Sequence, residues 1–274
     1  MIPLDPTWWP VATRSFKNIH RLIEAAVKTL PVAESFTADV EAAIERIEKL
    51  EGRKPSATYK PSSMKCIRNM YFQIVSAKLD DERASAALIG IGESGTDRHE
   101  RIQAVLSKAK EVGVDIEYID VESYIKEHNL TNLEVVAKKG FETKLRHTGL
   151  NLSFMCDGII KYKGRYFIFE FKTESIYKWQ PRSGIAEEHI PQATTYSICF
   201  ELDDVLFLYE NRDNCTHKSY ELHVTPEMKM EVIGKIQECD QWVSKQTPPP
   251  IPADITKKIC QYCNYKDECK KAGT

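Results

Sequence analysis

The sequence has no hydrophobic run long enough to cross a membrane, because no stretch approaches the roughly 18 apolar residues of a transmembrane helix. Its start, MIPLDPTWWP, has no basic region followed by an apolar one, so we expect no secretory signal and a cytoplasmic location. A basic surplus is also missing, since 40 Asp and Glu residues outnumber 38 Lys and Arg residues. Proteins that bind nucleic acid usually carry a basic surface, so any such role here requires a local patch.

What the sequence does contain is typical of a globular protein: 274 residues, of which 42% are hydrophobic and 28% charged. It shows no internal repeat. Eight cysteines are present, and a reducing compartment disfavours a disulfide framework, so their spacing has to be considered instead.

The hydrophobic pattern predicts a helical front, a mainly β centre with one helix inside it, and a helix followed by a tail. This order predicts an α/β fold, a central mixed sheet flanked by helices, with a helical N-terminal region over 1–60, a core over 61–246 and a tail over 247–274. We expect helices over 13–29, over 38–51, within 60–78, over 94–113, over 191–200 and for about twenty residues after Thr225. In the second of these, Thr37 is the expected N-cap and Gly52 the expected stop. We expect strands within 133–172 and over 204–210 and 220–224.

The stretch DGIIKYKGRYFIFEFKTE (157–174) reads as a β-hairpin. If Lys163 and Gly164 form a two-residue turn, Tyr162 lies opposite Arg165 and Asp157 lies opposite Glu170. Strand alternation then places Lys172 on the same face as Glu170. The alternating aromatic residues Phe167, Phe169 and Phe171 would point to the other face, into the core.

Two carboxylates and one ammonium group therefore converge at the open end of this hairpin. Like charges directly opposed on a sheet are destabilising unless a cation lies between them, and oxygen ligands suit Mg²⁺ or Mn²⁺. The alternative is a solvated strand end with an ordinary Glu170–Lys172 pair, and the hairpin alone leaves both readings open.

With its spacing, CDGII followed by EFK resembles the core of the PD-(D/E)XK nuclease superfamily. The resemblance implies a restriction-endonuclease-like core in which Asp157 and Glu170 bind a metal ion. It also implies that Lys172 positions or activates the attacking water for cleavage of a phosphodiester bond.

Two further motifs resemble the RecB-like branch of that superfamily. GTDRH (95–99) is similar to its Gly-x-x-x-His motif, which implies that His99 is a third metal ligand rather than a core histidine. QATTY (192–196) is similar to its Gln-x-x-x-Tyr motif, and spacing of four residues puts Gln192 and Tyr196 on one helix face. The resemblance implies that both contact the DNA backbone and support the site. The alternative is a helix surface with one half-buried tyrosine.

The cysteines add a third similarity. Cys260, Cys263 and Cys269 form a C-x2-C-x5-C pattern in the tail, and Cys66 lies far upstream. This resembles the iron–sulfur nucleases of the AddB and CRISPR-associated Cas-four type, which implies a [4Fe–4S] cluster on four thiolates. Tetrahedral zinc uses the same ligand set and stays open as an alternative. The other cysteines, Cys156, Cys199, Cys215 and Cys239, read as small core or half-exposed residues.

The resemblance as a whole implies a metal-dependent DNA exonuclease that acts on free, single-stranded ends, with recombination or replication proteins as candidate partners. We expect no association with a membrane. An end-trimming endonuclease within a larger complex and a non-catalytic DNA-binding adaptor are the alternatives. The basic residues that could follow the DNA, or that serve only solubility, are Lys65, Arg68, Lys257, Lys258, Lys270 and Lys271.

Overall fold

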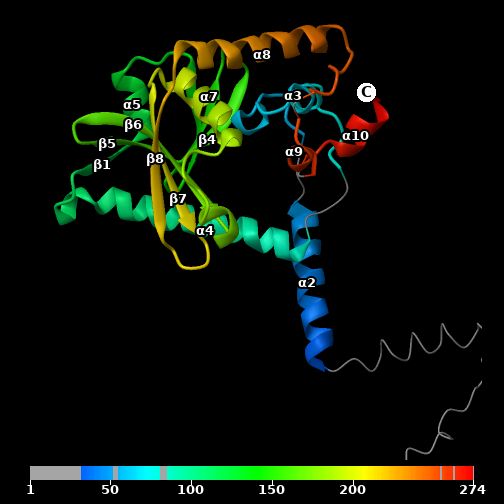
Figure 1. Ribbon diagram of the computed structural model, residues 1–274, viewed down its shortest axis with the longest axis horizontal. Helices are drawn as coiled ribbons and strands as arrows, with labels where there is room; N and C mark the ends of the chain where they lie inside the picture. The colour runs from blue at the N-terminus through cyan, green and yellow to red at the C-terminus, as the bar shows by residue number, and fades with distance from the viewer. Residues whose placement is uncertain (1–31, 52–54, 81–84, 254, 262, 274) are drawn as a thin grey trace, which may run out of the picture. The chain divides into compact units, whose positions relative to one another are not determined.

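The structure is a computed structural model that describes residues 32–51, 55–80, 85–253, 255–261 and 263–273 (Figure 1). Among these residues, no helix combines the length and the apolar character that a membrane crossing requires. The chain divides into two compact units, the first comprising Met1–Glu51 with Ala84–Ile89 and the second Gly52–Arg83 with Gly90–Thr274.

The described part of the first unit contains helix α2, which spans Val32–Glu51. The helix predicted over 38–51 is therefore present but begins earlier. The prediction that Thr37 is its N-cap is wrong, because Thr37 lies inside the helix and its hydroxyl donates to a carbonyl one turn earlier, at 3.1 Å. The predicted helix over 13–29 and the stop at Gly52 lie outside the described residues.

The second unit is built on a mixed sheet of five strands in the order β1-β5-β6-β7-β8. β6 and β7 are parallel, and the other neighbouring strands are antiparallel. Helices flank the sheet, so the fold is the expected mixed α/β arrangement, consistent with a restriction-endonuclease-like core. The strands are β1 (Ile116–Ile119), β5 (Gly158–Tyr162), β6 (Arg165–Glu174), β7 (Asp204–Asn211) and β8 (His217–His223).

The predicted hairpin is confirmed by the pairing of β5 with β6. Tyr162 pairs with Arg165, and the turn residues Lys163 and Gly164 both have positive φ, of 49° and 79°. Positive φ at both central residues is the signature of the type I′ turn that two-residue hairpins favour.

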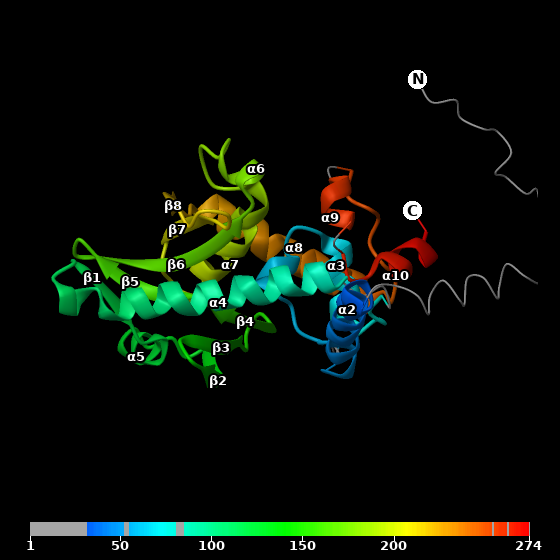
Figure 2. The same cartoon turned by 90° about the horizontal axis from the view of Figure 1, so that it is seen from below.

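A second, antiparallel sheet consists of β2 (Leu133–Lys139), β3 (Glu142–His147) and β4 (Leu152–Cys156). Figure 2 shows these three short strands set apart from the five-stranded sheet. Only Asp157 separates the end of β4 from the start of β5. This one residue is therefore where the chain passes from the small sheet to the large one.

Helices cover both faces of the large sheet. On one face, Ile102 of α4 (Ala86–Lys108) packs against alternate side chains of β6, and Figure 2 shows the helix running along this sheet. On the other face, Ile168 of β6 belongs to the main core together with Phe200 of α7 (Ile190–Phe200). The α4-facing residues of β6 are Phe167, Phe169 and Phe171, as the strand alternation predicted.

The remaining helices agree with the sequence in part. The helix expected after Thr225 is α8 (Pro226–Ser244), and the Thr225 hydroxyl caps it. The helix expected over 94–113 instead spans Ala86–Lys108, and its earlier start adds Gly90 and Gly92, each of which disfavours a helix by about 1 kcal/mol relative to alanine. The sequence did not predict β1, α5 (Val121–Glu127) or α6 (Ile176–Trp179). The remaining α-helices of the second unit are α3 (Ile67–Ile74), α9 (Lys257–Gln261) and α10 (Lys266–Lys271).

The C-terminal tail is fastened to the segment that contains α3. The carboxylate of Asp80 accepts from the backbone N–H groups of Lys266 and Asp267, at 2.8 and 3.0 Å, and so caps the start of α10. The backbone N–H of Asp80 donates to the carbonyl of Asn264 at 2.9 Å. These bonds hold the segment that follows Cys66 against the tail that contains Cys260, Cys263 and Cys269.

Candidate functional site

Asp157 occupies a position shared by the two sheets. In the small sheet the last paired residues of β3 and β4 are Thr143 and Cys156, so continuing that register places Glu142 opposite Asp157. In the large sheet Gly158 pairs with Phe169, so continuing that register places Glu170 opposite Asp157, as the sequence predicted. Asp157 therefore stands between two other carboxylates.

Gly158 makes this passage between the sheets possible. Its φ is +152°, which L-residues rarely adopt, and a Cβ there would lie 2.6 Å from the ring of Tyr118. The same tyrosine donates its hydroxyl to the carbonyl of Asp157 at 2.8 Å, as does the side-chain amide of Gln103 at 2.7 Å. The backbone around Asp157 is thus fixed by packing and by two hydrogen bonds.

We expect Gly158→Ala to destabilise the protein by about 1–3 kcal/mol, because the new methyl group meets the Tyr118 ring and alanine is held at a φ that L-residues rarely adopt. Thermal unfolding measures this. Gly184→Ala is the matched control, since no atom lies within 4 Å of its added Cβ. Equal shifts in melting temperature for the two variants would contradict the role given to Gly158.

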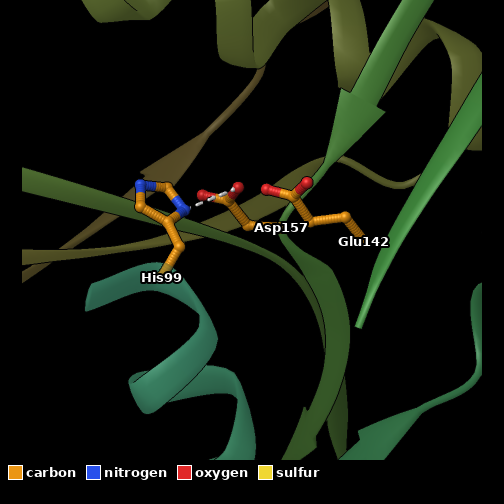
Figure 3. Close-up of side chains that lie close together, drawn as sticks. All are labelled: His99, Glu142 and Asp157. Carbon is orange, nitrogen blue, oxygen red and sulfur yellow. Dashed lines mark hydrogen bonds and ion pairs between the residues drawn. The ribbon is translucent and has the colours of Figure 1, made fainter. Parts of the chain in front are cut away.

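The side chains of His99 and Glu142 converge on the Asp157 carboxylate. His99 of α4 places its Nδ1 atom 3.1 Å from Oδ1, and Oδ2 accepts the backbone N–H of Phe171 at 2.8 Å. The ligand atoms of His99, Asp157 and Glu142 all lie within 4.8 Å of one another, and Figure 3 shows the three side chains meeting. A nitrogen and two carboxylates in this arrangement can hold a divalent cation.

Sequence reasoning missed Glu142, since it named only His99, Asp157 and Glu170 as metal ligands. Among the described residues, no group of three ligand atoms within that distance includes Glu170. A signal for Glu142 was present in the sequence, because a hairpin between LRH and NLSFMCD fixes which residue faces Asp157. Its loop, however, has no Asn-Gly or Asp-Gly turn to set that register.

Glu170 is only 2% exposed and lies in a polar network of its own. Its Oε1 atom lies 2.5 Å from Nζ of Lys172 and accepts from the side-chain amide of Gln192 at 3.1 Å. Its Oε2 atom is buried and, within the described part of the chain, has no hydrogen-bond partner. A buried carboxylate oxygen without a partner costs about 1–3 kcal/mol, so this atom fits a cation that the protein alone does not supply.

Burial and charge set the protonation of these groups. Burial raises the pKa of Glu170 to about 7, with Lys172 opposing the shift and Asp157 adding to it. For Lys172 burial acts to lower the pKa, but the negative charges of Glu170 and Asp157 outweigh it and the pKa is raised. For His99 burial likewise acts to lower the pKa, but the hydrogen bond with Asp157 and the negative charges of Asp157 and Glu170 together outweigh it, so that its pKa is also raised.

If Glu170 and His99 hold a cation, we expect Mn²⁺ binding to weaken about tenfold between pH 8 and pH 6, because the cation would have to displace the protons that these side chains gain as the pH falls through 7. Calorimetric titration at the two pH values measures the affinity, and buffers of different ionisation enthalpy report the protons released. An affinity that stays constant from pH 6 to 8 would contradict the raised pKa of Glu170.

The Gln-x-x-x-Tyr motif of α7 contributes to the network of Glu170 and Lys172 in a different way from the prediction. Tyr196 is 4% exposed, and its hydroxyl donates to the carbonyl of Met155 at 3.2 Å and accepts from the amide of Gln192 at 2.8 Å. Direct contact of Tyr196 with DNA is therefore wrong for this structure, because its hydroxyl is enclosed. Gln192 is half-buried and touches Glu170 and Lys172, so it reaches the site itself.

The predicted DNA contact of Arg68 is wrong for the same reason. Arg68 is 3% exposed, and its guanidinium donates to the carbonyls of Pro249, Cys269 and Gly273. It fastens the tail rather than facing solvent. Lys65, one turn earlier, is exposed.

The four predicted cluster cysteines line one cavity of about 520 Å³. The thiol sulfur of Cys263 accepts from the side-chain amide of Asn69 at 3.2 Å and from the backbone N–H of Tyr265 at 3.5 Å. Among the described residues, no three of these sulfurs lie within 4.8 Å of one another. Four thiolates on one zinc ion would stand about 3.8 Å apart, so the arrangement is wider than a zinc site. Its members are Cys66, Cys260, Cys263 and Cys269.

No family model and no curated protein matches this chain. Among solved structures, SSO0001 is 16% identical, with 88% of this chain and 98% of that chain covered and a TM-score of 0.45. LHK-Exo in complex with dAMP is 11% identical, with coverage of 69% and 89% and a TM-score of 0.43. The alkaline exonuclease LHK-Exo from Laribacter hongkongensis is 12% identical, with coverage of 70% and 92% and a TM-score of 0.29.

Proposed function

We propose that this protein is a metal-dependent DNA nuclease, and more specifically an exonuclease that acts on free single-stranded ends. The observation that carries the proposal is the ion pair of buried Glu170 with half-buried Lys172, beside the group of His99, Asp157 and Glu142. Asp157 lies opposite Glu142 in the register of the small sheet and opposite Glu170 in that of the large sheet, and like charges opposed in this way are destabilising without a cation. This arrangement supports a catalytic centre over a non-catalytic adaptor.

The side chains of this centre have distinct tasks. His99, Glu142, Asp157 and Glu170 would hold the cation, which when bound makes water a better nucleophile and offsets the charge on the phosphate. Lys172 keeps its ammonium group protonated and 2.5 Å from Glu170, where it orients water and stabilises the negative charge that develops during phosphodiester cleavage. Gln192 holds Lys172 and Glu170 in place from α7, at 3.4 and 3.1 Å.

We further propose a [4Fe–4S] cluster on the four cysteines of the tail cavity. The cavity, its four thiols and the N–H donors on Cys263 support this, because cluster ligands commonly accept such hydrogen bonds. Four ligands on four separate iron atoms also stand farther apart than four ligands on one zinc ion. Its role would be to brace the tail against α3.

Cleavage assays test the nuclease proposal. Purified protein with Mg²⁺ or Mn²⁺ is incubated with end-labelled linear single-stranded DNA, linear duplex and covalently closed single-stranded circles. We expect the linear single strand to be degraded fastest and the circles to be spared in Mg²⁺. Rapid cutting of circles would favour the endonuclease alternative, and DNA binding without any cleavage would favour the adaptor.

Metal analysis tests the cluster. Anaerobically purified protein should be brown and contain about four iron and four sulfide per chain. Stoichiometric zinc without sulfide would overturn the iron–sulfur assignment and leave the nuclease proposal untouched.

A further inference from the structure

The exposed face of the small sheet continues from the ligand group (His99, Glu142 and Asp157). Along β3, buried residues alternate with the exposed cations Lys144 and Arg146. Glu142 lies on the same face as these two, because alternate residues of a strand share a face. Its side chain points toward Asp157 (Figure 3), so the face that carries both cations begins at the ligand group itself.

Lys144 and Arg146 form a line that leads away from that group. A strand rises about 3.4 Å per residue, so their Cα atoms lie about 7 and 14 Å from the start of β3. In the described part of the chain, neither cation pairs with a carboxylate. By contrast, Lys138 of the neighbouring β2 is bound to Asp120 and Glu122, at 2.9 and 3.0 Å. The line therefore keeps its positive charge available for a ligand.

Apolar side chains flank Lys144 on both sides. Met155 of β4 lies directly opposite Lys144 and is 46% exposed. On the other side, a bulge in β2 places Val136 next to Ala137, the residue opposite Lys144, and Val136 is 53% exposed. Proteins bind single-stranded nucleic acid by combining positive charge along the backbone with side chains on which the bases pack. This face offers both, with apolar chains in place of rings.

We propose that a single DNA strand lies across this face, with its backbone along Lys144 and Arg146 and its cleaved phosphate at the ligand group. The inference rests on the proposed nuclease function and assigns the surface that holds the substrate. Acidic residues outnumber basic ones by two in the whole chain, so DNA binding requires a local line of this kind. The surface that the sequence suggested included Arg68, which is enclosed.

A single strand fits this face better than a duplex. Three strands about 4.8 Å apart make a face about 10 Å wide, which is narrower than the major groove of B-DNA alone, at about 12 Å. One line of cations neutralises one backbone, whereas a duplex presents phosphates on two. The bases of a duplex are also stacked and paired inside it, out of reach of Met155 and Val136.

Fluorescence anisotropy of a labelled single-stranded oligonucleotide tests this, with Ca²⁺ in place of Mg²⁺ because its looser coordination suits binding rather than cleavage. We expect Lys144→Gln combined with Arg146→Gln to raise the Kd about tenfold or more. The slope of log affinity against log salt should become shallower by about 1.4, since each phosphate contact of a single strand contributes about 0.7. The matched control, Lys108→Gln combined with Lys163→Gln, removes two exposed lysines elsewhere and should keep the wild-type slope.

Glu134→Lys gives a result that loss of folding cannot imitate. Glu134 is exposed and lies opposite Arg146 on the same face, so reversing its charge should tighten DNA binding several-fold and steepen the salt slope by about 0.7. Glu127→Lys, at an exposed position of α5, is the matched control and should keep the wild-type slope.

The outcomes separate this surface from the proposed function. Wild-type binding of DNA that neither the double variant nor Glu134→Lys alters overturns the surface and leaves the nuclease proposal standing. No binding of DNA by the wild type overturns both. Larger changes for a duplex of the same sequence than for the single strand overturn the single strand as the occupant. Where the double variant folds poorly, the result with Glu134→Lys decides.

Discussion

Lys172→Met should lower the rate of DNA cleavage by about a hundredfold to ten-thousandfold, the range expected when one charge-stabilising or proton-positioning group is removed from an active centre. Methionine keeps the length and most of the packing of the lysine, whose side chain is 21% exposed. The loss therefore reports the ammonium group rather than a cavity. Single-turnover cleavage of end-labelled single-stranded DNA measures it.

DNA affinity should stay within a few-fold of the wild type in this variant, because Lys172 is committed to Glu170 and Gln192 inside the site. Lys178→Met is the matched control, since Lys178 follows the same strand on α6 and lies outside the network. Wild-type cleavage by Lys172→Met would remove the active-site assignment. A fall in DNA affinity equal to the fall in rate would instead make Lys172 a binding residue.

The elements nearest the site were the easiest to predict from the sequence. The register of 157–174 followed from one local feature, a Lys-Gly turn between alternating apolar residues, and the structure has the same pairs. α7 and α8 were also predictable because Pro191 and Thr225 lie at their starts, where the missing N–H and the capping hydroxyl belong. For the hairpin and these two helices, the local sequence was enough to predict the element.

Prediction failed where long-range packing decides. α4 extends back beyond the predicted start at residue 94 through Gly90 and Gly92, which propensity alone would place outside a helix. Glu142 entered the site through the pairing of β3 with β4, and the loop between them carries no strong turn signal. Arg68 looked like a surface charge in a basic stretch, but three carbonyls from the distant tail enclose it. These three carbonyls lie 181, 201 and 205 residues from Arg68 in the sequence.

The enclosure of Arg68 leads to a second large effect. Arg68→Met should destabilise the protein by about 3 kcal/mol, because the carbonyls of Pro249, Cys269 and Gly273 lose their donor together. For a domain of this size that lowers the melting temperature by about 6–12 °C. Hydrogen exchange in α10 should become faster as well, since the guanidinium is one of the groups that hold the tail in place.

Two comparisons separate this from the DNA-binding role that the sequence suggested for Arg68. Arg68→Lys keeps the charge but cannot reach three carbonyls with one compact ammonium group, so it should be destabilised nearly as much as the methionine variant. Lys65→Met removes an exposed charge one turn away and should leave the melting temperature unchanged. If Arg68 instead served DNA, the lysine variant would keep both stability and most of the affinity, and the methionine variant would lose affinity at an unchanged melting temperature.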